Sequence, residues 1–153
     1  MTFLRALMLL ALVVWIGGII FFAFVVAPIV FTVLPTTIEA GNVVSHALTI
    51  LHWMGIGSGI VFLICSLLYN RAKYARVKMF AMAHVLIVIM LVLTLISQFG
   101  ITPRMQALRA ELHSGNGIAD QEFARLHEWS TRLEGGVLIL GLAAVFLTAR
   151  RFS

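Results

Sequence analysis

The sequence predicts an all-α integral membrane protein, folded as a single four-helix bundle over residues 1–153. Three observations support this fold class. Hydrophobic side chains make up 61% of the 153 residues and charged ones only 11%, with a mean hydropathy of +1.06, whereas soluble domains contain about 25% charged residues. The apolar residues form four long runs, and the charged residues lie mainly between them. A chain of this composition requires the lipid bilayer as its solvent.

The four runs set the expected spans. A helix crosses the hydrocarbon core, about 30 Å thick, with roughly 20 apolar residues. We expect spans at residues 6–34, 43–69, 79–102 and 130–150. The first run carries no charge and is longer than the roughly 7–15 apolar residues of a cleavable signal peptide. It is therefore expected to be a span.

The fourth run is short. Its uncharged part, Gly135 to Ala149, gives only about 22 Å of helix, so the helix must extend toward its N-terminus to cross. We expect it to begin near Gln121 with Asp120 as N-cap, which brings Glu134 to the edge of the hydrocarbon. The third and fourth helices are therefore expected to extend beyond the outer surface.

Basic residues predict the orientation. The segment "RAKYARVK" (residues 71–78) has four basic residues and no acid, and Arg5 and Arg150–Arg151 fall on the same side. By the positive-inside rule, both termini are expected in the cytoplasm. In a bacterium the membrane would be the inner one. The net charge of +5 forms no basic patch with interleaved aromatic residues, so we expect no nucleic-acid partner.

Motifs for chemistry are scarce. The lone Cys65 excludes an intrachain disulfide, and no nucleophile with an adjacent base or phosphate-binding loop supports an enzyme. Met79 and Met82 have a spacing that would suit Cu(I), although methionines more often fill packing gaps. "GIGSG" contains a GxxxG pattern, which favours close helix packing.

Ionisable residues inside spans are functional candidates because they are costly in lipid. His52 lies in the second span, Arg104 ends the third, and His84 is nearer the cytoplasmic end. On the fourth helix, polar residues at i, i+3, i+4 and i+7 share one face: His127, Ser130, Thr131 and Glu134. We expect this face to meet His52 and Arg104 in the outer half of the bundle, at a depth that His84 does not share.

Three interpretations of this cluster stay open. In the structural one, Arg104 pairs with Glu134 or Glu128, and the network fixes helix packing. In the second, His52 and His127 bind a transition metal or haem, with a carboxylate orienting an imidazole. In the third, the cluster binds or transports an ion or small solute, and Glu134 and His52 exchange protons. The predicted binding site comprises Arg104, His127, Ser130, Glu134 and His52. A homo-oligomer is compatible with four short spans.

Four segments in order resemble a known family: "WIGGIIFFAFVVAPIVFTVLP", "EAGNVVSHALTILHWMG", "ITPRMQALR" and "FARLHEWSTRLEGG". They are similar to the membrane family of unknown function that includes transmembrane protein 205. The matching positions are Phe31, Leu34–Pro35, Gly41, Pro103–Arg104, His127, Ser130 and Glu134.

The resemblance implies a four-helix membrane protein without an established activity. Where Glu134 stands, asparagine is usual in the animal members, and "SHALTILHW" replaces the Phe-Pro that often follows the loop glycine. The fold also resembles the copper-resistance D-type and small haem-associated membrane families, an analogy that favours the metal interpretation.

Overall fold

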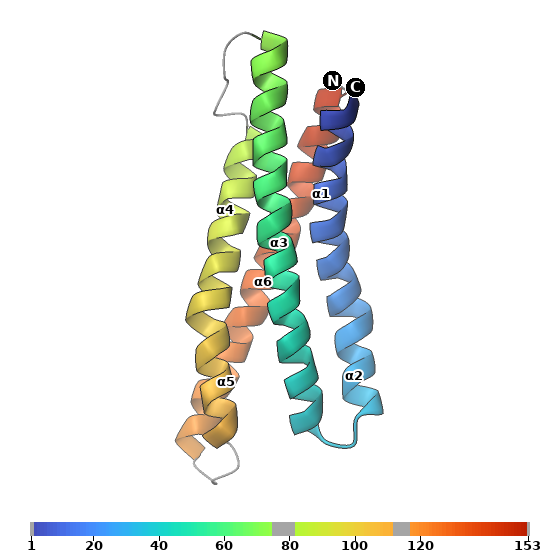
Figure 1. The fold of residues 1–153 in the computed structure, drawn as a ribbon. Coiled ribbons are helices and arrows are strands. Elements are labelled where there is room, and N and C mark those ends of the chain that lie inside the picture. Colours follow the sequence, from blue (N-terminus) through green and yellow to red (C-terminus); the bar gives the residue numbers. More distant parts are fainter. Residues whose placement is uncertain (1, 75–81, 112–116, 153) are drawn as a thin grey trace.

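The computed structural model describes residues 2–74, 82–111 and 117–152, which form four long helical rods lying side by side (Figure 1). The first rod is α1 (Thr2–Phe21), a π-helical turn η1 (Phe22–Val26) and α2 (Ala27–Val33), and the second is α3 (Thr37–Tyr74). The third is α4 (Met82–Ile96), a π-helical turn η2 (Ser97–Ile101) and α5 (Thr102–Glu111), and the fourth is α6 (Gly117–Phe152). The all-α four-helix prediction is confirmed.

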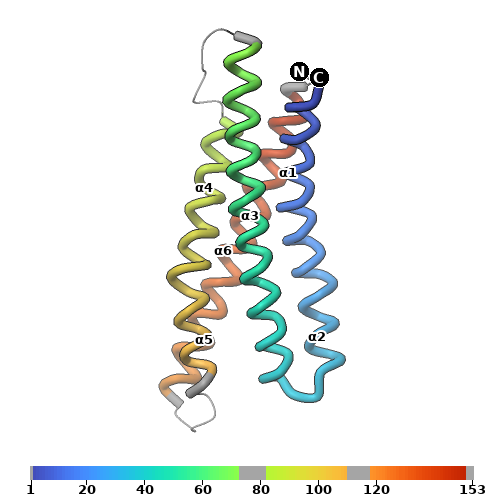
Figure 2. Tube along the Cα trace, in the orientation of Figure 1, coloured from blue at the N-terminus to red at the C-terminus, as the bar shows by residue number. Residues whose placement is uncertain are grey.

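Each rod is long and apolar enough to cross a membrane: Thr2–Val33, Thr37–Ala72, Met82–Arg109 and Ile118–Arg150. Both termini lie at the same end of the bundle, as the colour-coded trace shows (Figure 2). We call the opposite end, formed by α2, α5 and the first turns of α3 and α6, the distal end. Residues 75–78 of the basic segment, together with Met79, lie outside the described residues.

A π-helical turn precedes a proline in both interrupted rods. Pro28 lies in the first turn of α2 directly after η1, and Pro103 lies in the first turn of α5 directly after η2. Proline has no N–H, and its ring crowds the preceding turn. A wider π turn relieves that crowding and is frequent at functional sites. At the end of η2, the Ser97 carbonyl accepts both the Thr102 backbone N–H and, at 2.9 Å, the Thr102 hydroxyl.

Pro35 ends the first rod. It disfavours the helical conformation of the residue before it, and Leu34 is extended, with φ −81° and ψ 141°. Thr36 then starts α3, because its hydroxyl accepts a hydrogen bond from the Glu39 N–H at 3.2 Å. This Thr-x-x-Glu spacing is that of a capping box. The second helix therefore begins six positions before the expected residue 43.

Trp15 organises the centre of the core. A Cβ at Gly55 would lie 2.4 Å from the Trp15 indole nitrogen, and one at Gly59 would lie 2.8 Å from its ring. Only glycine at these two positions lets α3 approach the indole so closely, which is the close packing expected from the GxxxG pattern. Between the core centre and the distal end, Ile16 of α1 packs equally closely on α6, because a Cβ at Gly141 would lie 2.8 Å from the Ile16 side chain.

The fourth helix extends far beyond its uncharged run, as expected, and α6 starts at Gly117. The prediction of Asp120 as N-cap is wrong, because Asp120 lies within the first turn. The carboxylate still lies at the positive end of the helix dipole, where it is favourable. The reason for the difference is local: "GNGIAD" reads as a flexible turn, yet its second half joins the helix.

Candidate functional site

Three polar side chains from three rods meet inside the bundle. His52 of α3 has its Nε2 2.6 Å from Glu134 Oε1 of α6 and its Nδ1 2.8 Å from Gln98 Oε1 of η2. His52 is 1% exposed and Glu134 17%. A polar group buried in a membrane protein is costly unless it is hydrogen-bonded, and here both imidazole nitrogens have partners. This row of three side chains, the Gln98–His52–Glu134 row, ties α3, η2 and α6 together.

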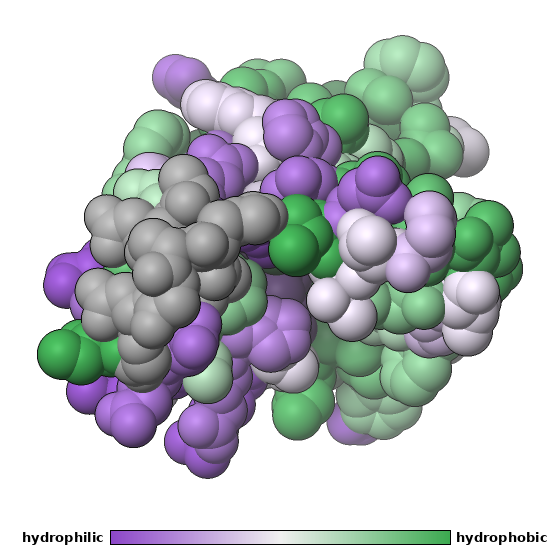
Figure 3. Space-filling view, turned by 90° about the horizontal axis from the view of Figure 1, so that it is seen from below, coloured by the Kyte–Doolittle hydropathy of each residue, from purple (hydrophilic) through white to green (hydrophobic). Residues whose placement is uncertain are grey.

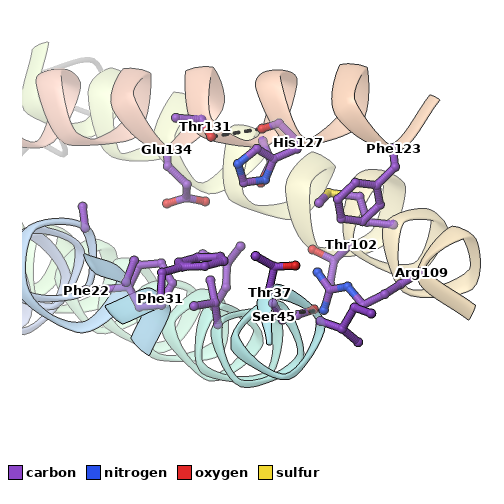
Figure 4. A pocket seen from close by; sticks show the side chains of 18 of the residues that line it. Phe22, Phe31, Thr37, Ser45, Thr102, Arg109, Phe123, His127, Thr131 and Glu134 are labelled. Atoms are coloured by element: carbon purple, nitrogen blue, oxygen red, sulfur yellow. Dashed lines mark hydrogen bonds between the residues drawn. The ribbon is translucent and has the colours of Figure 1, made fainter. Parts of the chain in front are cut away.

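The Glu134 carboxylate also lines a pocket of about 510 Å³ in the distal half. Ligand sites commonly have volumes of about 300–1,000 Å³ and combine apolar walls with a few polar groups. Glu134 and His127 project from α6 into the space opposite Phe22, Phe31 and Thr37 (Figure 4). Viewed from the distal end, hydrophilic residues border a hollow near the middle of the molecule (Figure 3).

The pocket forms where the first rod separates from α6. Ile16 of α1 packs directly on Gly141 of α6. Farther toward the distal end, η1 and α2 follow α3 instead, and the space between them and α6 is the pocket. Its walls include the side chains of Ile19, Phe22, Phe31 and Leu48 on one side. The diverging helices therefore leave a largely apolar chamber with the Gln98–His52–Glu134 row at its inner end.

The predicted polar face of the fourth helix lines this pocket. His127, Ser130, Thr131 and Glu134 are all among the lining residues. Ser130 is buried, and the Thr131 hydroxyl donates to the His127 carbonyl at 3.0 Å, so that it is bonded within its own helix. The His127 ring stacks on Phe123, with centroids 6.4 Å apart and planes at 5°. The 3.6-residue period of the helix places these four side chains together.

Arg104 is not part of this site. Its Nη2 lies 2.5 Å from Glu122 Oε1, and the Arg104 side chain is 66% exposed. The expected pairing of Arg104 with Glu134 or Glu128 is wrong: Glu134 contacts His52, and Glu128 contacts Arg132. The reason is rotation about the helix axis, because the face of α5 that meets the pocket carries other residues.

Arg109 is the arginine at the pocket. Its guanidinium donates to the Gly41 carbonyl at 2.5 Å and to Asn42 Oδ1 at 3.2 Å, and it lies 5.4 Å from the centre of the Phe123 ring. Thr102, Met105 and Arg109 are spaced i, i+3 and i+7 and all line the pocket. Arg109 thus joins α5 to the start of α3 at the distal rim.

Sequence reasoning missed Gln98 and Arg109. Gln98 is an uncharged amide in the apolar segment "LISQFG", and a search confined to ionisable residues passes over it. Arg109 lies beyond the expected end of the third span at residue 102, in a polar stretch between spans. The i, i+3, i+7 pattern with Thr102 and Met105 was the available signal for it, provided that the helix continues through Pro103.

His84 and His46 do not join the site, and His113 lies outside the described residues. His84 is buried in the half of the bundle nearer the termini, and His46 bonds to the Asn42 carbonyl at the exposed surface. In the described parts of the chain, no three His, Cys, Asp or Glu side chains are grouped so that they could hold a metal ion. His52 would have to break a contact to Gln98 or Glu134 to become a ligand, whereas His127 faces the pocket with its ring nitrogens.

In comparison with known proteins, the chain matches the model of one protein family. A family model described as "Domain of unknown function (DUF4149)" matches residues 10–114. The matched region contains His52, Gln98 and Arg109, and it ends before the α6 residues that line the pocket. No curated protein and no solved structure matches the chain.

Proposed function

The chain belongs to the DUF4149 family, a family of unknown function, and we propose that it is a membrane protein that binds a small solute in the distal pocket and releases a proton when the solute binds. The observation that carries the proposal is the contact of a buried imidazole with a carboxylate, at 2.6 Å, where the carboxylate also lines the pocket. Binding coupled to release of the proton would suit solute transport.

The short contact between His52 and Glu134 needs a proton between its two atoms. With Nδ1–H donating to the Gln98 oxygen, a hydrogen bond between Nε2 and the carboxylate needs a proton on one of the two partners. The pair is then either imidazolium with carboxylate or neutral imidazole with carboxylic acid. Loss of the proton leaves a net negative charge at a poorly solvated site. A cation in the pocket would compensate that charge, so one positive group can replace one proton.

The walls support a partly apolar solute with a positive or hydrogen-bond-donating group. Phe22, Phe31 and Met105 offer apolar and aromatic surface, and aromatic faces attract cations. Glu134 at the inner end would meet the positive group, and His127 and Ser130 would orient it. Arg109 at the rim is engaged by the Gly41 carbonyl and would exclude a second cation or hold an anionic end.

Phenethylammonium, an aromatic ring with one ammonium group, is a suitable probe. Calorimetry on the protein in mild detergent, repeated in buffers of different ionisation enthalpy, would report its affinity and the protons released. We expect binding with release of up to one proton, and a loss of about tenfold or more in Glu134→Gln, because charge-assisted hydrogen bonds contribute about 1.5–3 kcal/mol.

Glu128→Gln is the matched control, because Glu128 lies on the same helix and pairs with Arg132 at the exposed surface. It should bind the probe like the parent protein. Phe31→Ala, which alters the wall without touching the carboxylate, should weaken binding without changing proton release. Equal affinities for the parent and Glu134→Gln would contradict the proposal.

We also infer an orientation and a wider family. The basic segment near residues 71–78 supports cytoplasmic termini, so that the pocket opens to the outer side, which in a bacterium faces away from the cytoplasm across the inner membrane. Labelling of a cysteine introduced at Glu128 by a membrane-impermeant reagent in intact cells tests this, and protection there would contradict it. We propose that this family and the family of transmembrane protein 205 are related, since three of the four segments that carry the resemblance lie within the matched residues.

Haem or a transition metal is the alternative ligand, and His127 is the residue that favours it, because its imidazole faces the pocket. An absorbance band or bound metal in the purified protein that His127→Ala removes would support this alternative over the solute.

A further inference from the structure

A second set of polar side chains is buried in the half of the bundle that carries the termini. Ser66, His84 and Thr148, from α3, α4 and α6, are each at most 5% exposed. Apolar core residues, among them Ile87 and Met90, lie between this set and the Gln98–His52–Glu134 row. Polar residues inside spans are costly and need a reason, and the pocket at the distal end does not supply one for these.

Helix register places Ser66 and His84 at one level. The α3 and α4 rods run in opposite directions, and His52 contacts Gln98. Ser66 follows His52 by as many residues as His84 precedes Gln98. Since both helices rise by about 1.5 Å per residue, the two side chains are at the same height between the same two helices.

Thr148 and Met8 belong to the same level. Gly141 of α6 packs against Ile16 of α1 and Met90 of α4. Thr148 lies about two turns beyond Gly141 toward the termini, and Met8 lies about two turns before Ile16 in the same direction. We call Ser66, His84 and Thr148 the upper polar layer. By the same count of residues, the fully buried Met8 lies at the level of this layer.

Two hydroxyls of this layer lack a partner. Ser66 Oγ and Thr148 Oγ1 are fully enclosed and have no hydrogen bond to the described residues. Buried side-chain polar atoms in native proteins nearly always have a partner, either protein or ordered water. Buried water typically makes about three hydrogen bonds to such groups. The Ser66 and Thr148 hydroxyls, one on each of two helices, supply polar partners for a water molecule.

We propose that the upper polar layer is a hydration site, in which water bridges Ser66 and Thr148 next to His84. This inference goes beyond the distal pocket, since it concerns the opposite half of the bundle and does not depend on a solute. With water in this layer, polar groups occupy both halves of the bundle, and an apolar zone around Ile87 and Met90 separates them.

Hydroxyl-radical footprinting by X-ray radiolysis tests the site, because trapped water generates radicals next to it. Met8 and Met90 form a matched pair: both are fully buried, but Met8 lies at the level of the layer, whereas Met90 lies six residues, roughly 9 Å, away from His84 along α4. In the full chain in mild detergent, we expect Met8 to be oxidised at least about three times faster than Met90. In Ser66→Ala/Thr148→Val this excess should disappear. Equal rates in the parent protein, or an excess that survives the double substitution, would overturn the proposal.

Stability gives a second, independent readout. If water bridges the hydroxyls, Ser66→Ala and Thr148→Val each remove one hydrogen-bond partner of that water. Tm should then fall by about 2–6 °C in each variant. If the hydroxyls are dry and unpaired, removing them should leave Tm unchanged or raise it, which would argue against the site. Thr131→Val is the control, since that hydroxyl is solvent-accessible and donates to the His127 carbonyl of its own helix, and its Tm should change little.

Discussion

The contact between His52 and Glu134 should be one of the strongest side-chain couplings in the bundle. His52→Leu replaces the imidazole with an apolar group of similar size and leaves the Glu134 carboxylate, 17% exposed, without its partner. Breaking a buried ion pair from one side costs about 3–5 kcal/mol. Because Glu134 keeps some contact with the pocket, we expect the lower end, about 3 kcal/mol. For a chain of this length that lowers Tm by about 6–12 °C.

The reciprocal change, Glu134→Leu, leaves the Nε2 of a fully buried imidazole without a hydrogen bond, which should cost about 2 kcal/mol. The double variant His52→Leu/Glu134→Leu removes both groups. It leaves only the Gln98 amide, which bonds to Nδ1 of His52 in the parent protein, without its partner. Its loss should be close to the smaller of the two single losses. The interaction energy from the double-mutant cycle is then about 3 kcal/mol in magnitude.

Unfolding in mixed detergent micelles, followed by far-UV circular dichroism, measures these free energies. The exposed pair of Arg132 and Glu128, four residues apart on α6, is the matched control. The corresponding leucine cycle there should give a coupling of less than about 0.5 kcal/mol. Single losses at His52 and Glu134 that simply add would refute the reasoning, because they would show that the two side chains do not stabilise one another.

Two further predictions concern packing and the pocket rim. Gly55→Ala places a methyl group 2.4 Å from the Trp15 indole and should lower the free energy of unfolding by about 1–3 kcal/mol through overpacking. Gly57→Ala, whose methyl group meets no atom within 4 Å, is the control and should be neutral or stabilising in the same unfolding assay. Equal effects of the two substitutions would contradict the close approach of α3 to Trp15. Arg109→Gln removes the charged donor to the Gly41 carbonyl and should speed amide hydrogen exchange in the first turns of α3 severalfold. Unchanged exchange rates there would show that Arg109 does not stabilise the N-terminal end of α3.

The fold could be predicted in outline because its determinants are local. The length of each apolar run fixes a crossing helix, and the 3.6-residue period places His127, Ser130, Thr131 and Glu134 on one face whatever surrounds it. The short fourth run implied the long α6. The helices α3 and α6 begin several residues before the expected positions, because capping by Thr36 and the helical state of "GIAD" (residues 117–120) depend on conformations that composition does not reveal.

The site was predicted less completely, because it depends on rotation between helices. Depth along the membrane follows from counting residues, and counting correctly separated His84 from His52. Rotation does not follow from counting, because π turns before Pro28 and Pro103 change the phase of each rod after them. Arg104, which follows the conspicuous Pro103, therefore lies outside the pocket, and Arg109 lines it.

The sequence by itself determined that this chain is an integral membrane protein with four crossing helices and a polar face on the last one. Hydrophobicity and periodicity act over a few neighbouring residues, so they can be read without the fold. Only the tertiary structure decided that Glu134 contacts His52, that Gln98 bonds to the second imidazole nitrogen, and that the carboxylate faces a pocket. Those contacts join residues from three rods, and their geometry is set by how the rods pack against Trp15 and the glycines around it.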